Sequence, residues 1–124
     1  MDNQSKIIGT RYVLVVKDLR KSGDFYITKL GFKTIWSDGG WHFLHRENFI
    51  VMLGECPEDR SAFETVNHSY FAYIDVEDID ALYQEFKDKQ VEILTAPNNE
   101  PWGQREFSIR TLDGHRMRFG QEIK

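Results

Sequence analysis

Two segments of this chain carry apolar residues at helical spacing. The clearest places four apolar side chains at positions i, i+3, i+4 and i+7, which predicts one face of a helix: Ile79, Leu82, Tyr83 and Phe86. Asp78 precedes this segment as the expected N-cap. A second helix is expected from about Leu19 to Leu30, with Asp18 as its N-cap and Gly31 at the position of a C-cap glycine.

The other apolar segments are short, rich in β-branched and aromatic residues, and separated by turn residues, which is typical of strands. They are Tyr12–Val16, Phe32–Ser37, Trp41–His45, Phe49–Leu53, Tyr70–Val76, Val91–Leu94, Arg105–Thr111 and His115–Phe119. The last two are predicted to form a hairpin with a three-residue loop ending in Gly114, because glycine adopts positive φ without steric cost. This register pairs Phe107 with Phe119, and Ile109 with Met117.

The order strand, helix, three strands occurs twice. Val16 corresponds to Val76, sixty positions later, whereas Met52 corresponds to Arg118, sixty-six positions later, because the second half has a longer loop before its last hairpin. An internal repeat indicates two copies of one supersecondary unit. We therefore expect an α+β fold, in which two βαβββ modules form a cup-shaped mixed sheet with the helices outside. Residues 1–124 are expected to form one domain, with modules at about 8–56 and 68–121.

Composition narrows the possible partners and the setting. The net charge is −4, so the chain lacks the general basic surface of a nucleic-acid-binding protein. The N-terminal residues lack the apolar core of a signal peptide, and no apolar run is long enough to span a bilayer. A single cysteine, Cys56, cannot form an internal disulfide, so a reducing, cytoplasmic setting is expected. The three Trp, five Tyr and nine Phe must fill a core, line a pocket, or both.

Short motifs at the helix ends and near the C-terminus carry a family resemblance. They are Asp18-Leu19 at the start of the first helix, Phe25-Tyr26 and Leu30-Gly31-Phe32 at its end, and Asp113-Gly114-His115. With the paired βαβββ units, the chain from Arg11 to Gln121 resembles the vicinal oxygen chelate superfamily. That superfamily holds glyoxalases, ring-cleaving dioxygenases, fosfomycin-resistance transferases and bleomycin-resistance proteins. The stretch from Pro101 to Phe107 is most similar to the bleomycin-resistance branch, which implies antibiotic resistance.

The resemblance implies four inward strand positions that hold metal ligands in the enzymatic members. Here they fall at Arg11, Met52, Phe71 (or its neighbour Tyr70) and Arg118. His is usual at the first, His or Gln at the third, and Glu at the fourth. Divalent cations prefer carboxylate, imidazole or thiolate ligands, which these positions do not supply. The sequence therefore predicts no metal, no other cofactor and no catalytic residue at these positions.

The turn registers predict which side chains face into the cup. A three-residue loop at Asp38-Gly39-Gly40 would pair Trp36 with His42, and a loop over residues 46–48 would pair His42 with Met52. Trp102, on a loop after Pro101, would lie at the rim. The expected ligand-binding residues are Arg11, Trp36, His42, Met52, Phe71, Trp102, Glu106 and Arg118.

Each of these residues has a structural alternative. Trp36 could be core, and Trp102 could be a lid that packs on its own sheet. A histidine such as His42 is more often a satisfied polar side chain than a base or a ligand. Arg11, Glu106 and Arg118 could form an internal ion-pair cluster, because buried charges need partners. If the cup is wet, the two arginines could instead hold a carboxylate or phosphate.

Three functions remain in competition. The first is a non-enzymatic protein that sequesters a planar or aromatic small molecule, such as an antibiotic or an unrelated metabolite. Cationic bleomycin itself would be opposed by Arg11 and Arg118. The second is a metal-dependent lyase, isomerase or transferase of the same superfamily, using displaced ligands such as His42 and Glu106. The third is a protein-interaction module with an empty cup.

A homodimer with ligand sites shared between the chains is also expected. The resemblance implies it, because small two-module chains of this superfamily commonly pair so that the cups form across two chains. Isologous pairing would also cover the sheet edges.

Overall fold

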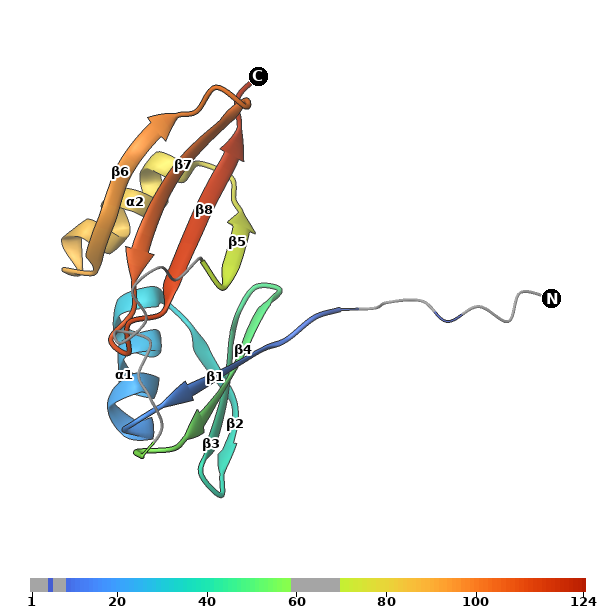
Figure 1. Cartoon of the computed structure of the whole chain (residues 1–124), viewed down its shortest axis with the longest axis vertical. Helices are drawn as coiled ribbons and strands as arrows, with labels where there is room; N and C mark the ends of the chain where they lie inside the picture. Colours follow the sequence, from blue (N-terminus) through green and yellow to red (C-terminus); the bar gives the residue numbers. More distant parts are fainter. Residues whose placement is uncertain (1–4, 6–8, 59–69) are drawn as a thin grey trace.

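The computed structural model describes residue 5, residues 9–58 and residues 70–124. They form two modules that follow one another along the long axis of the molecule (Figure 1). The polar stretch from Gly54 to Asn67, which contains Pro57, is predicted from the sequence to connect the modules, and most of it lies outside the described residues.

Each module has the same order of elements. The first contains β1 (Tyr12–Val16), α1 (Leu19–Leu30), β2 (Lys33–Asp38), β3 (Trp41–Arg46) and β4 (Phe49–Glu55). The second contains β5 (Ala72–Asp75), α2 (Ile79–Asp88), β6 (Glu92–Asn99), β7 (Gln104–Arg110) and β8 (Arg116–Glu122). The two four-stranded sheets have the orders β1-β4-β3-β2 and β5-β8-β7-β6, and each has one parallel pair, β1 with β4 and β5 with β8. The predicted α+β fold of two βαβββ modules with mixed sheets is confirmed.

The predicted helix ends are present. The Asp18 side chain accepts a hydrogen bond from the Lys21 amide at 3.1 Å, which satisfies one of the free N–H groups of the first turn of α1. Gly31 ends this helix with φ at 80°, a conformation that glycine adopts without a steric cost. Asp78 caps α2 through the Ala81 amide.

The C-terminal hairpin has the predicted register. Phe107 pairs with Phe119, and Ile109 pairs with Met117. These four side chains lie on the face covered by α2 and belong to a buried core that also contains apolar residues of the first module. Neither helix of the described residues is long and apolar enough to cross a membrane.

The two hairpins of the first module differ from the prediction by one residue. Asp38 pairs with Trp41, and Arg46 pairs with Phe49, so both turns have two residues instead of three. Positive φ values at Gly39 and Gly40 fit the tight turn that matches the twist of two paired strands.

This shift changes the side chains that share a face. Trp36 pairs with Phe43, and Phe43 pairs with Met52, so the predicted pairs of Trp36 with His42 and of His42 with Met52 are wrong. His42 lies on the helix side, where its ring fills the space beside Gly23 of α1, while Trp41 and Phe43 lie on the other face.

Strand β6 is longer than predicted. The predicted strand ended at Leu94, but β6 continues to Asn99 through two irregularities in its pairing with β7. Pro97 is tolerated because β6 is an edge strand, where a missing N–H leaves no partner unsatisfied.

Candidate functional site

The candidate site is built on the faces of the two sheets that the helices leave open. In the first sheet one row crosses all four strands, and each of its members pairs with the next: Val13, Met52, Phe43 and Trp36. Every member of this row is apolar. Val13 is 64% exposed and Trp36 is 48% exposed, although large apolar side chains usually avoid water. An exposed apolar surface of this kind is typical of a binding face.

The corresponding row of the second sheet has different chemistry. Its members are Tyr73, Arg118, Ser108 and Thr95. The next row contains Glu106, which pairs with Gly120 of β8 and Asn98 of β6. Polar and charged side chains therefore occupy the open face of the second module.

Glu106 is the centre of a hydrogen-bond network on this face. It is only 4% exposed, and its carboxylate accepts from three donors. The Arg118 Nη1 donates to Oε1 at 3.0 Å, while the Tyr73 hydroxyl and the Trp102 Nε1 donate to Oε2 at 2.7 and 3.0 Å. Such charge-assisted hydrogen bonds are stronger than those between neutral groups.

Arg118 of β8 is held by two side chains of β7 and by Tyr70, just before β5. Besides Glu106, its Nε donates to the Ser108 hydroxyl at 3.1 Å, and its Nη2 donates to the Tyr70 hydroxyl at 3.2 Å. The guanidinium also lies 4.6 Å from the centre of the Tyr70 ring, within cation–π range. This geometry fixes the cation instead of leaving it free.

The Tyr73 side chain reaches Glu106 by crossing Gly120. A Cβ at position 120 would collide with the Tyr73 hydroxyl, so glycine at this position is required for the contact. Burial and the hydrogen bond to Glu106 both raise the pKa of Tyr73, and the phenol stays protonated as a donor.

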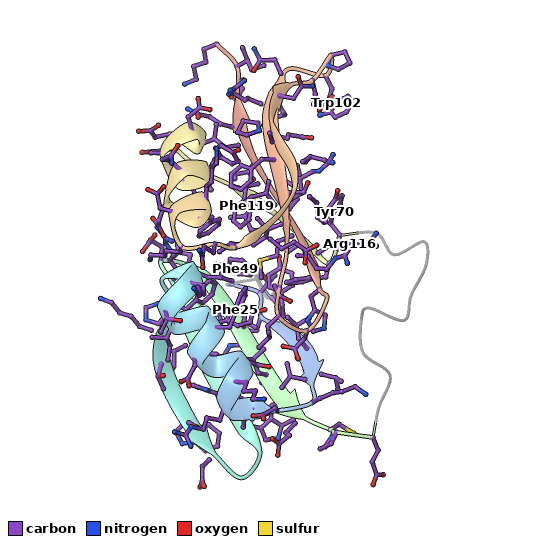
Figure 2. The ribbon with its side chains drawn as sticks, turned by 90° about the vertical axis from the view of Figure 1, so that its left-hand side faces the viewer. Phe25, Phe49, Tyr70, Trp102, Arg116 and Phe119 are labelled. Atoms are coloured by element: carbon purple, nitrogen blue, oxygen red, sulfur yellow. The ribbon has the colours of Figure 1, made fainter. Side chains whose placement is uncertain are left out.

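Trp102 is anchored at one end only. It lies in the turn before β7, and its indole N–H donates to Glu106, yet the side chain is 61% exposed. Figure 2 shows Trp102 and Tyr70 on the side of the second sheet away from α2, and Phe119 between the sheet and that helix. The indole ring is thus fixed in direction while much of its surface remains open for stacking.

The structure separates the predicted ligand-binding residues into groups. Trp36 and Met52 lie on the open face of the first sheet, and Arg118 and Glu106 lie on that of the second, with Trp102 beside them. Arg11 is exposed just before β1 and makes no ion pair with another described residue, so the predicted three-residue ion-pair cluster reduces to Glu106 and Arg118.

Two of the predicted residues do not line an open face. His42 hydrogen-bonds to the Thr34 hydroxyl at 2.8 Å on the helix side, and burial lowers its pKa. Phe71 packs edge-on against Tyr12 and His115, with ring centres 5.8 and 5.9 Å apart. Its neighbour Tyr70 is the residue that contacts Arg118.

Sequence reasoning missed six residues of the open faces: Val13, Trp41, Phe43, Tyr73, Thr95 and Ser108. The predicted turns of the first module were one residue too long, which placed Trp41 and Phe43 on the helix side. Ser108 could have been found from the alternation of β7, because it lies two positions after Glu106 and therefore on the same face.

The four positions that hold metal ligands in related enzymes do not fit a metal in this chain. Arg118 brings a cation to the fourth position, and the carboxylate beside it, Glu106, already accepts hydrogen bonds from Arg118, Tyr73 and Trp102. Within residues 9–58 and 70–124, no three His, Cys, Asp or Glu side chains are grouped as a metal site would require.

Comparison with known proteins supports the family resemblance that was predicted from the sequence. Bleomycin resistance proteins of Geobacillus stearothermophilus and Staphylococcus aureus are each 31% identical to this chain, and the similarity covers 90% of it and 94% of each relative. The crystal structure of a bleomycin-binding protein from Streptomyces verticillus, complexed with copper(II)-bleomycin, is 25% identical with a TM-score of 0.74, covering 94% of this chain and 97% of that one. Residues 10–119 match a single family description, and the chain belongs to the Glyoxalase/Bleomycin resistance protein/Dioxygenase superfamily.

Proposed function

We propose that this protein binds and sequesters a planar or aromatic small molecule, without a metal, on the open faces of its sheets. The observation that carries this proposal is the Glu106–Arg118 pair at 3.0 Å. Arg118 occupies a position where the related enzymes have a metal ligand. Its ion pair with Glu106 instead provides fixed polar groups among aromatic rings at this position. Pockets with a few placed polar groups among aromatic side chains are typical of small-molecule sites.

An antibiotic of the bleomycin type is the first ligand to test. The similarity to bleomycin resistance proteins supports this choice. From the sequence, Arg11 and Arg118 were expected to oppose a cationic ligand. Glu106 compensates the charge of Arg118, so of these two arginines Arg11 alone would still oppose such a ligand.

We also propose that the working unit is a homodimer whose sites are shared between chains. The exposed apolar row of the first sheet, with Val13 and Trp36 at its ends, supports pairing with a second copy. An isologous contact that placed this row opposite the Glu106 network of the partner would give the ligand one apolar wall and one polar wall.

The metal-dependent alternative has less support. It required His42 and Glu106 as displaced ligands, but these residues lie on different sheets, and His42 faces α1. No observation on the described residues favours an enzyme over a binding protein.

Titration of the purified protein with bleomycin, followed by tryptophan fluorescence, tests the binding proposal. We expect saturable quenching with metal-free and copper-loaded drug alike, and native mass spectrometry should show a dimer with bound drug. Elemental analysis should find far less than one zinc, nickel, iron or manganese per chain. Close to one such metal per chain would contradict the metal-free proposal. Absence of binding to bleomycin, with a different aromatic compound co-purifying, would change the ligand but keep the function.

A further inference from the structure

We infer that Glu106 is the positioning and selectivity residue of the open face of the second sheet. It orients Trp102 and Tyr73 and compensates Arg118, so this face favours uncharged or cationic aromatic molecules over aromatic anions. The selectivity part of this inference rests on the proposed binding function, whereas the positioning part can be tested without any ligand.

Glu106 is bound to protein groups and is largely closed to a ligand. Its two carboxylate oxygens accept hydrogen bonds from three protein donors, and the residue is only 4% exposed. Glu106 therefore acts on a ligand through the groups that it holds. A buried carboxylate is stable at this position because Arg118 is bound to it.

Glu106 also restricts the side chain of Trp102. A loop tryptophan without an anchor would lose rotamer freedom when it stacks on a ligand, and this ordering weakens binding. The hydrogen bond from Trp102 Nε1 to Glu106 at 3.0 Å restricts the indole before a ligand arrives. Tyr73 is fixed by the same oxygen, at 2.7 Å. The Glu106 carboxylate thus holds the side chains of Trp102 and Tyr73 in place before a ligand binds.

Glu106 also compensates positive charge on this face of the sheet. The alternation of β7 and β8 places Arg110 and Arg116 on the same face as Arg118. The Nε of Arg110 lies 3.7 Å from the Oε2 of Glu92, which is on the edge strand β6. Without Glu106, the Arg118 guanidinium would be an uncompensated cation beside these arginines and would attract aromatic anions.

The substitution Glu106→Gln tests the selectivity part, because it keeps the shape of the side chain and removes its charge. The probes are two planar aromatic compounds of opposite charge, anilinonaphthalene sulfonate and ethidium, titrated against the parent and the variant. We expect the ratio of anion to cation affinity to rise about ten-fold in the variant, as expected for one uncompensated charge near a partly exposed site.

Two further variants control this result. Glu106→Gln combined with Arg118→Gln removes both charges and should return the affinity ratio to the parental value. Asp80→Asn removes a carboxylate of the same charge from the exposed pair that Asp80 forms with Arg105 at 2.9 Å, and it should leave the ratio unchanged. A ratio that is the same in the parent and in Glu106→Gln, with both folded, overturns the selectivity role.

Positioning is measured in a background in which Trp36 and Trp41 are replaced by Phe, so that Trp102 is the one remaining tryptophan. In this background Glu106→Leu, which removes both acceptor oxygens, should lower the fluorescence anisotropy of Trp102 and increase its quenching by acrylamide. Unchanged values overturn the positioning role. A parent protein that binds neither probe, with a changed Trp102 signal, refutes the binding function and the selectivity while supporting the positioning by Glu106.

Discussion

The two modules place a glycine at equivalent positions of their sheets, Gly54 and Gly120, sixty-six residues apart. An aromatic ring covers each glycine, but the rings come from different strands. The ring of Trp41 on β3 lies over Gly54, and that of Tyr73 on β5 lies over Gly120. In the first module the ring extends an apolar surface. In the second, the tyrosine hydroxyl reaches a buried carboxylate, Glu106.

The difference between the faces of each sheet explains this divergence. On the helix side the repeat conserves apolar character in the pairs Leu14–Ile74, Leu44–Ile109, Val51–Met117 and Leu53–Phe119. On the open side, Met52 corresponds to Arg118 and Phe43 to Ser108. The helix side must remain apolar because it forms the core, whereas the open side contributes little to that core. The two modules therefore share a scaffold and supply different walls of the proposed site.

Equivalent charged substitutions should separate the two faces most strongly. Arg118→Glu would place a second carboxylate against Glu106 and leave it without its cation, and breaking such a buried pair costs about 3–5 kcal/mol. Met52→Glu, at the equivalent position, should cost less than about 1 kcal/mol, because Met52 is partly exposed and pairs with the exposed Val13. Denaturant unfolding at neutral pH measures both values. Equal losses in the two variants would refute the distinction between the faces.

Trp102→Ala and Trp36→Ala compare the contribution of each face to ligand binding. Trp102→Ala should weaken binding of an aromatic ligand about ten-fold, or roughly 1.4 kcal/mol, and reduce stability by about 1 kcal/mol or less through the lost hydrogen bond to Glu106. Trp36→Ala should weaken binding and also remove its ring contact with Phe43, whose centre is 5.1 Å away. Fluorescence titration and thermal unfolding separate these effects. Parental affinity in Trp102→Ala would exclude that ring from the site.

The smallest expected effect concerns the ion pair that joins the modules. Arg46 of β3 donates to Glu85 of α2 at 2.8 Å, and this hydrogen bond holds the pKa of Glu85 below its usual value. A lowered pKa contributes stability above the ordinary pKa of a glutamate, and this contribution is lost as pH falls through the folded-state pKa. Because both side chains are partly exposed, Glu85→Gln should cost only about 0.5–1 kcal/mol at pH 7. Unfolding measured from pH 7 down to about pH 3 should show the parent and variant converging at the acidic end. A constant difference would contradict this assignment.

The sequence by itself determined the elements and their repeat. The helical stripe of α2, the capping residues Asp18 and Asp78, and the pairing of Phe107 with Phe119 were all predictable, because they follow from local periodicity and from one apolar face. The family resemblance also placed Arg118 at a position where the enzymatic members have a metal ligand. These features depend on neighbouring residues, whose spacing is visible in the chain.

Only the tertiary structure decided which side chains meet across the sheets. A turn of two residues instead of three moved His42 to the helix side and brought Phe43 between Trp36 and Met52. Glu106 and Arg118 were candidates, but their union with Tyr73, Trp102 and Tyr70 joins segments up to 48 residues apart. Strand register changes by whole residues, and each step reverses the face of every following side chain, so a small error in a turn displaces an entire site.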